Sequence, residues 1–198
     1  MRLICPPHPQ AAIVKGAALR GLEGIKPTRT RCRRHYGFYL NMPFRDGIDP
    51  EKDAYIHPWY RTKYCKNRIL WAISKGEYVD ASTFIENRVE TSHYLGDPLQ
   101  SSLTIYSSAY ESPPERTTDL GADHVGTIKC NFYGINLQQF ESRQVGGFKC
   151  WMLKYAAQVF LGAQEGLLCF KVVSGGKQIG QTHIEYTNRS PTTTLAQS

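Results

Sequence analysis

The sequence predicts a mainly β fold, an antiparallel β-sandwich preceded by one helix. Short runs of aromatic and β-branched residues recur through residues 35–186, and clusters of glycine, proline, aspartate and serine separate these runs. The strongest turn signal is the Gly175-Gly176 pair, because glycine accepts the positive φ angles of a tight turn between antiparallel strands. Residues 10–22 instead show the apolar spacing that is typical of a helix.

The predicted helix over residues 10–22 is preceded by prolines at positions 6, 7 and 9, which favour a helix start. Gly16 lies inside it and costs about 1 kcal/mol relative to alanine, which indicates close packing against a neighbour or a ligand. Its recurring apolar positions are Ala12, Ile13, Ala17 and Leu22.

Seven strands are expected after this helix, a number and spacing typical of an antiparallel sandwich. Residues 84–94 are expected to form a short helix or an irregular connection. The Thr- and Ser-rich residues 187–198 are expected to form a frayed tail. The expected strands span residues 35–41, 68–73, 101–107, 125–133, 147–155, 166–173 and 178–186.

Composition describes a folded, basic chain. Hydrophobic residues make up 41% and charged residues 21% of the 198 residues, which excludes a disordered or fibrous chain. Residues 1–75 hold 15 Lys and Arg against 5 Asp and Glu, whereas residues 76–198 hold 9 against 12. The sequence has no apolar run of the roughly 18 residues that a membrane helix needs, and its start does not fit a signal peptide. A cytoplasmic location is therefore expected.

The basic excess is concentrated in residues 26–35, and it allows two interpretations. The favoured one is a connector, residues 26–34, whose cations stay solvated or face an acidic partner. The alternative is nucleic-acid binding through residues 26–39, with cations on phosphates and aromatic rings stacked on bases. The residues it would use are Lys26, Arg29, Arg31, Arg33, Arg34, Tyr36, Phe38 and Tyr39, with Lys63, Lys66 and Arg68 nearby.

Catalytic and metal-binding motifs are not found. The sequence contains no G-x-S-x-G, no phosphate-binding glycine loop and no H-E-x-x-H. The cysteines at 5, 32, 65, 130, 150 and 169 include no C-x-x-C pair, so no metal site is expected. Cys130, Cys150 and Cys169 fall in predicted strands and are expected to act as small buried hydrophobes. Residues 44–50 lack the order of a calcium loop and are expected to form a surface loop.

The order of several segments resembles the heat shock protein 70 family, in particular its divergent heat shock 70 kDa protein 12 branch. The resemblance extends from residue 3 to about residue 186, and it depends on the order and spacing of short segments that the chain shares with the family. The segments are Pro6-Pro7 with AAIVKGAA at 11–18, RHYG at 34–37, the run from Cys65 to Val79, IYSS at 105–108 and FLGAQE at 160–165.

The resemblance implies four parts of the chain. Residues 1–25 would be the closing remnant of an actin-like ATPase domain, residues 26–34 a connector, residues 35–186 a substrate-binding β-sandwich and residues 187–198 a tail. The family's nucleotide machinery lies upstream of these segments. The chain is therefore expected to be a C-terminal fragment of a chaperone, without enzyme activity of its own.

The resemblance also implies ligands and partners. The full-length family binds ATP, and only the edge of its adenine site would fall in this chain, at Gln10, where the family has an aspartate. This chain alone is expected to bind no cofactor. The expected partners are a peptide or protein client and the missing ATPase domain, with neither nucleic acid nor membrane. The nucleic-acid interpretation of residues 26–39 is the alternative function.

Overall fold

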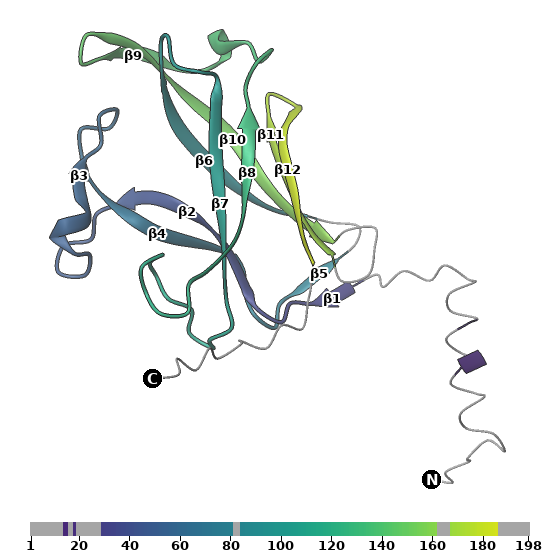
Figure 1. Ribbon diagram of the computed structural model, residues 1–198. Coiled ribbons are helices and arrows are strands. Elements are labelled where there is room, and N and C mark those ends of the chain that lie inside the picture. The colour runs from purple at the N-terminus through teal and green to yellow at the C-terminus, as the bar shows by residue number, and fades with distance from the viewer. Residues whose placement is uncertain (1–13, 16–17, 19–28, 81–83, 162–166, 186–198) are drawn as a thin grey trace, which may run out of the picture.

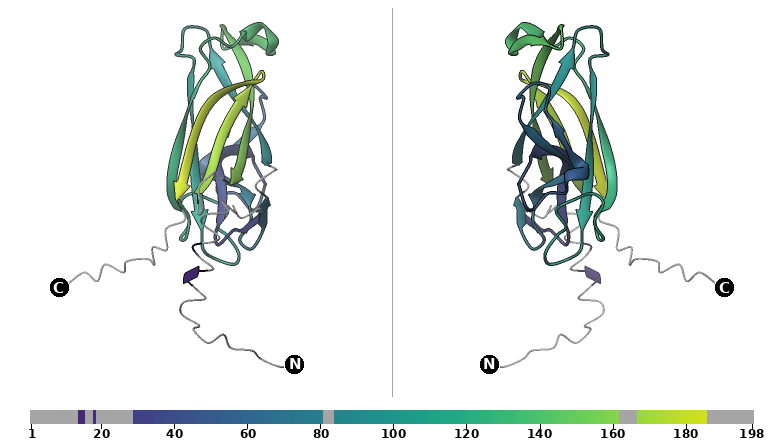
Figure 2. Two further views of the ribbon diagram at one scale, coloured as in Figure 1. Left: turned by 90° about the vertical axis from the view of Figure 1, so that its right-hand side faces the viewer. Right: turned by 90° about the vertical axis from the view of Figure 1, so that its left-hand side faces the viewer.

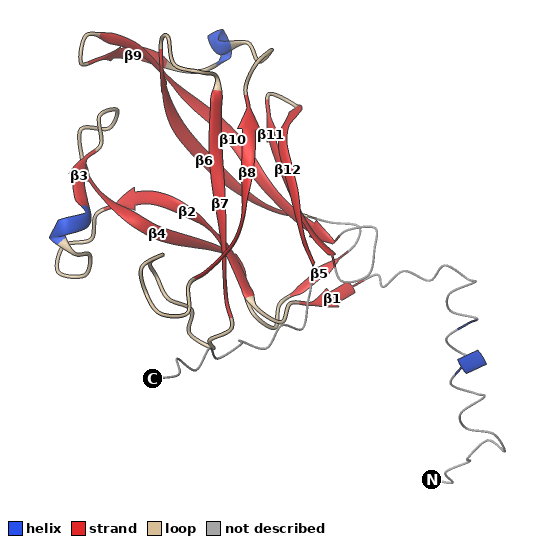
Figure 3. Cartoon of the chain, viewed as in Figure 1, coloured by secondary structure: helices blue, strands red, loops and turns tan. Residues whose placement is uncertain are grey.

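The computed structural model describes residues 14–15, 18, 29–80, 84–161 and 167–185 (Figure 1). Strands dominate these ranges, with only short helical turns at η1 (Glu51–Asp53) and η2 (Leu137–Gln139) outside residues 14–18 (Figure 3). Every strand pairing is antiparallel. The predicted mainly β, antiparallel fold is thus confirmed.

The first sheet has five strands in the order β3-β4-β2-β7-β8. A bulge interrupts the β2–β4 ladder between Leu40 and Met42, where Asn67 of β4 adopts a φ of +62°. Asparagine tolerates this left-handed conformation better than most residues. The strands span β2 (His35–Pro43), β3 (Ala54–Ile56), β4 (Lys63–Ile73), β7 (Gln100–Ser108) and β8 (Asp123–Asn131).

The second sheet has the order β12-β11-β10-β6, and β9 pairs with β10. A separate two-stranded ladder joins β1 to β5. The edge strands β8 and β12 approach each other on one side of the molecule. These strands span β1 (Arg29–Arg31), β5 (Tyr78–Asp80), β6 (Ile85–Tyr94), β9 (Ser142–Val145), β10 (Phe148–Leu161), β11 (Leu167–Ser174) and β12 (Lys177–Glu185).

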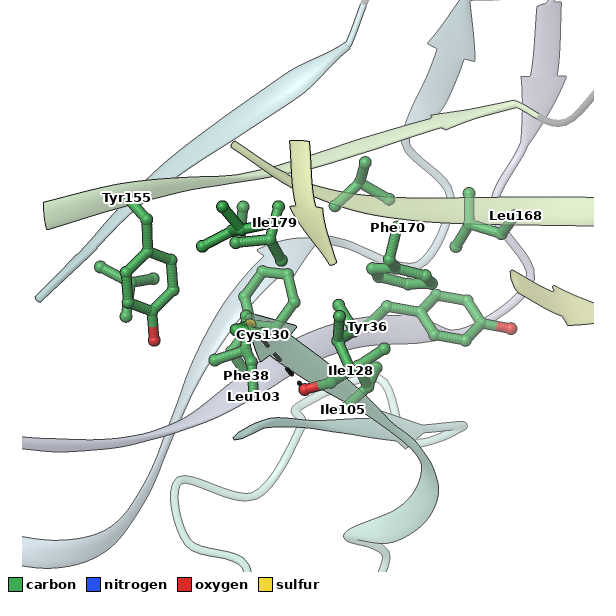
Figure 4. Close-up of a cluster of buried hydrophobic side chains, with 14 of the residues drawn as sticks. Tyr36, Phe38, Leu103, Ile105, Ile128, Cys130, Tyr155, Leu168, Phe170 and Ile179 are labelled. Carbon is green, nitrogen blue, oxygen red and sulfur yellow. Dashed lines mark hydrogen bonds between the residues drawn. The ribbon is translucent and has the colours of Figure 1, made fainter. Parts of the chain in front are cut away.

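The two sheets pack face to face around one hydrophobic core (Figures 2 and 4). Phe38 of β2 and Phe170 of β11 are both fully buried, and their ring centroids lie 6.0 Å apart in an edge-to-face arrangement. Burying such a side chain contributes about 1.5–3 kcal/mol, so the contact between these two rings helps to hold the two sheets together. Other core side chains of the first sheet are Leu103, Ile105 and Ile128, and of the second Leu153, Val159 and Leu168.

All seven predicted strands overlap strands of the structure, most of which are longer than predicted. The Gly175-Gly176 turn between β11 and β12 is confirmed, with φ angles of +53° and +75°. The prediction for residues 84–94 is wrong, because residues 85–94 form β6. Its alternation of half-buried or buried residues with exposed charged ones has the period of a strand.

Four short strands were not predicted: β1, β3, β5 and β9. Each has only three or four residues, too few for an alternating pattern to show. Strand β1 lies inside the predicted connector 26–34. Most of the predicted helix 10–22 lies outside the described residues; Val14, Lys15 and Ala18 are described, and their backbone is helical. The predicted tail 187–198 also lies outside the described residues.

Candidate functional site

The loop that joins β3 to β4, residues 57–62, is organised by its first residue. The backbone N–H of His57 donates to the carbonyl of Thr62 over 2.8 Å. The Nδ1 atom of His57 accepts from the backbone N–H groups of Trp59 (3.1 Å) and Tyr60 (3.3 Å). Burial lowers the pKa of His57 below its ordinary 6.5, which keeps this ring neutral and able to accept hydrogen bonds near neutral pH.

Aromatic rings from β3, β4 and this loop form one cluster. His57 and Tyr64 have ring centroids 4.6 Å apart, and Tyr60 stacks on Tyr64 at 5.8 Å with an interplanar angle of 5°. The ring centroid of Tyr55 lies 6.1 Å from that of His57 and 6.2 Å from that of Tyr64. Offset and edge contacts of this kind add about 0.5–1.5 kcal/mol per pair. The cluster therefore fixes the direction in which the 57–62 loop projects from the first sheet.

The loop reaches the outer face of the second sheet. Trp59 is only 3% exposed and packs with Cys150 and Met152, which lie on the face of β10 opposite the main core. The guanidinium carbon of Arg143 lies 4.1 Å from the centre of a Trp59 ring, a cation–π contact. The loop thus connects the edge of one sheet to the back of the other.

Tyr60 extends this contact to β6. Its hydroxyl donates to the Glu90 carboxylate, and this hydrogen bond raises the pKa of Tyr60 to about 12. Glu90 also lies 3.6 Å from the Lys154 ammonium of β10. Glu90 is therefore positioned from two sides, by the loop and by the neighbouring strand.

Beyond Glu90 the outer face is hollowed into a cavity of about 480 Å³, which we call the β6 pocket. Ala156 lies directly opposite Arg88 in the β6–β10 ladder, and its small side chain leaves room above the sheet. The pocket is lined by Glu86, Arg88, Glu90, Lys154, Ala156, Val173 and the turn Ser174–Gly176, with Val89 and Tyr155 beneath.

Strand β6 also forms an edge of the second sheet. Over its ten residues it pairs with β10 on one side, and no strand in the described part of the chain pairs with its other side. Glu86, Arg88 and Glu90 are exposed and alternate on the face that lines the pocket. The edge thus combines unpaired strand backbone with a negative, positive, negative series of side chains.

A buried carboxylate fixes the predicted surface loop 44–50. The Asp49 side chain is fully buried, which the sequence did not lead us to expect. Its oxygens lie 3.0 Å from both Arg45 and Arg68 and 3.3 Å from Arg116. Hydrogen bonds from Arg45, with the charges of Arg68 and Arg116, hold the pKa of Asp49 well below its usual range.

A second cavity, of about 630 Å³, lies where β1 meets the turn between β4 and β5, and we call it the β1 pocket. Two hydrogen bonds fix its walls: Cys32 N–H to the Glu77 carbonyl at 2.8 Å, and Gly76 N–H to the Cys32 carbonyl at 2.7 Å. Four of its lining residues are cations. It is lined by Arg29, Thr30, Arg31, Cys32, Arg33 and Lys75.

The structure separates the residues of the nucleic-acid interpretation. Tyr36 and Phe38 are buried in the core and present no ring for base stacking. Arg68 is turned to Asp49, and Lys63 lies 2.6 Å from Glu51. Lys66 lies over the Tyr55 ring, and Arg34 pairs with Asp123. Arg29, Arg31 and Arg33 come together, joined by Lys75, whose place beside them depends on the β1–β5 ladder and could not be predicted from spacing.

The described cysteines are buried or half-buried. Cys130 and Cys150 are buried as expected, whereas Cys169 is only half-buried. Burial raises the pKa of the Cys130 thiol to about 11 and also raises those of Cys65, Cys150 and Cys169, so these groups are protonated at neutral pH. No group of His, Cys, Asp and Glu able to hold a metal ion occurs among the described residues. Gln10 lies outside them.

Comparison with protein-family models, with characterised proteins and with solved structures gave no match for this chain. Within the part of the chain that the structure describes, no helix is long and apolar enough to cross a membrane.

Proposed function

We propose that the chain is a polypeptide-binding β-domain of a chaperone of the heat shock protein 70 kind, acting in the cytoplasm by binding and not by catalysis. The order of sequence segments described above supports this family. The observation that carries the proposal is the edge of β6 beside the β6 pocket. An extended peptide can add a strand to such an edge, with affinity from backbone hydrogen bonds and selectivity from alternate side chains.

The pocket differs from the apolar groove expected of a general chaperone, because its β6 side is charged. A peptide strand beside β6 would place its alternate side chains next to Glu86, Arg88 and Glu90. The best complement carries Lys, Glu and Lys at alternate positions, with β-branched residues between them. We therefore propose a client segment that is extended and alternates in charge.

The test is fluorescence anisotropy with a short labelled peptide of this pattern and with its charge-reversed partner. The first peptide should bind in a saturable manner, and Arg88→Glu should weaken it about fivefold, since cross-strand charge pairs contribute roughly 0.2–1 kcal/mol each. Arg88→Glu should in turn improve binding of a peptide with Lys at the central position. Lys129→Glu makes the same charge change on β8, outside the pocket, and should leave both affinities unchanged.

Two results would contradict the proposal. One is the lack of saturable binding of either peptide to the unmodified chain. The other is an equal response of Arg88→Glu and Lys129→Glu, which would show that net charge and not the β6 edge controls binding.

A proline at a middle position of the peptide should also abolish binding, because it removes a backbone donor.

The ATP-binding part of the proposal concerns the longer family proteins. We propose that their actin-like domain binds ATP as its cofactor and that this chain alone lacks that cofactor site. Calorimetry with ATP on this chain and on a version extended with an upstream ATPase domain tests it. The expected result is a saturable ATP site that the extended version has and this chain lacks, and equal ATP binding by the two would contradict it.

Nucleic-acid binding through residues 26–39 stays as the second candidate function, and the cations of the β1 pocket favour it. Its affinity should fall steeply with salt, with a log–log slope near the number of phosphate contacts. Peptide addition at β6, which depends mainly on backbone hydrogen bonds, should respond much less.

A further inference from the structure

We propose that the β1 pocket is a binding site for a ligand that carries two or more phosphate groups in close succession. This inference is independent of peptide binding at β6. It rests on the cations that line one concavity, on how their positions are fixed and on the few carboxylates near them.

The cations come from separate parts of the chain. Arg29, Arg31 and Arg33 alternate along β1 and the residues after it, whereas Lys75 belongs to the turn between β4 and β5. Pairing of β1 with β5 brings this turn against β1. A volume of about 630 Å³ falls within the usual range of small-molecule sites, about 300–1,000 Å³, and exceeds the need of a single ion.

Two of the arginines are held in place. The Nε–H of Arg31 donates to the Gly76 carbonyl over 3.1 Å, which leaves the outer N–H groups of the guanidinium for a ligand. Arg29 lies over the ring of Tyr78, 4.7 Å from its centre. Positioned guanidinium groups suit phosphate because they bind its oxygens in a bidentate manner, with little side-chain freedom left to lose.

Among the described residues, the carboxylates near the pocket are fewer than its cations. Asp80 lies opposite Arg29 in the β1–β5 ladder. Among the side chains that the structure describes, neither Arg29 nor Arg31 forms an ion pair. Lys75 pairs with Glu111, a side chain that is 87% exposed and can be displaced at little cost. The Glu77 carboxylate accepts from the Ser74 backbone N–H and faces its own turn. The pocket therefore has an excess of positive charge that a multiply charged anion would balance.

A compact phosphate ligand fits better than a nucleic-acid strand. Strand binding requires a basic groove with successive stacking rings, whereas Tyr36 and Phe38 are in the core and the exposed Tyr78 ring has Arg29 against one of its faces. Of the other cations of the second candidate function, Lys63, Arg68 and Arg34 form ion pairs elsewhere.

The experiment is calorimetric titration of the full chain with pyrophosphate at moderate ionic strength. One saturable site is expected, with weaker binding of inorganic phosphate. Arg31→Gln and Lys75→Gln should each weaken pyrophosphate about tenfold, the loss of one charge-assisted hydrogen bond. Lys52→Gln and Lys129→Gln remove the same charge from exposed positions outside the pocket and should have no effect.

Thermal unfolding of each variant verifies that the fold is intact, and Arg29→Gln provides a further pocket variant if Lys75→Gln is unstable. The proposal is overturned if pyrophosphate shows no saturable binding, or if the control variants weaken it as much as the pocket variants do. It is equally overturned if a single-stranded oligonucleotide or a glutamate-rich peptide binds more tightly than pyrophosphate and with the same sensitivity to Arg31→Gln.

Discussion

Asp49 shows how a single buried charge orders the residues around it. Its carboxylate contacts three arginines that come from the 44–50 loop, from β4 and from the loop between β7 and β8. The arginine side chains are between 11% and 33% exposed, so solvent screens these pairs only in part. Without the carboxylate, Arg68 and Arg116 would lose the partner that they share, whereas Arg45 would keep its ion pair with Glu115.

We predict that Asp49→Asn lowers the free energy of unfolding by about 3 kcal/mol at neutral pH, because removing the carboxylate leaves the charges of Arg68 and Arg116 without their ion-pair partner. Urea unfolding measures this change. Asp46→Asn is the matched control, since the Asp46 side chain is 94% exposed and its one ion pair, with Lys63, has the long N–O distance of 4.0 Å. This substitution should change the free energy of unfolding by less than about 0.5 kcal/mol. Equal effects of the two substitutions would refute the role of Asp49.

At the scale of the element, close strand packing limits which residue fits. A Cβ atom on Gly37 of β2 would lie 2.5 Å from the Leu70 carbonyl and 2.9 Å from the Trp71 Cα atom, both on the neighbouring strand β4. A Cβ atom on Gly126 of β8 would meet nothing within 4 Å. Two glycines inside strands of the same sheet therefore have different roles.

Gly37→Ala should destabilise the protein by roughly 2 kcal/mol or more, because backbone atoms must shift to admit the methyl group. Gly126→Ala should be neutral or stabilising by up to about 1 kcal/mol, since alanine loses less conformational freedom in a strand. The midpoints of urea unfolding for the two variants provide the comparison. A loss at both sites would point to a general intolerance of side chains in this sheet, against the packing argument.

At the scale of the whole molecule, the two sheets are joined by the core and by the 57–62 loop, and protonation of histidine weakens the second of these. His57 accepts two backbone hydrogen bonds at Nδ1, which a protonated ring cannot do. His93 is also buried. Burial lowers the pKa of both rings below 6.5, so the unfolded chain takes up protons more readily than the folded one.

We predict that this stabilisation is complete above about pH 6.5 and is lost as the pH falls from there toward the lowered pKa values. The midpoint of thermal unfolding, followed between about pH 7.5 and 5.5, should therefore decrease. His57→Asn supplies a carbonyl acceptor that does not titrate in this range, and it should reduce the slope to the part that His93 contributes. An unchanged slope in this variant would exclude His57 as its source.

The sequence predicted most of the fold and little of the two pockets. Long strands such as β10 were predictable because their runs of aromatic and aliphatic residues are longer than a turn. Strand β6 was not predicted, because the residues between its charged side chains are partly polar, and this weakens the apolar–polar alternation that indicates a strand. The β6 pocket depends on Ala156 lying opposite Arg88, a register that only pairing with β10 sets.

The sequence by itself determined the antiparallel β character, the Gly175-Gly176 turn and the concentration of positive charge before residue 35, because each depends on local composition and backbone preference. Only the tertiary structure decided that Phe38 belongs to the core while Arg31 faces a pocket, that Lys75 joins the arginines of β1 and that the Asp49 carboxylate is buried. These features depend on contacts between residues far apart in the chain, and local pattern carries no information about which distant segments meet.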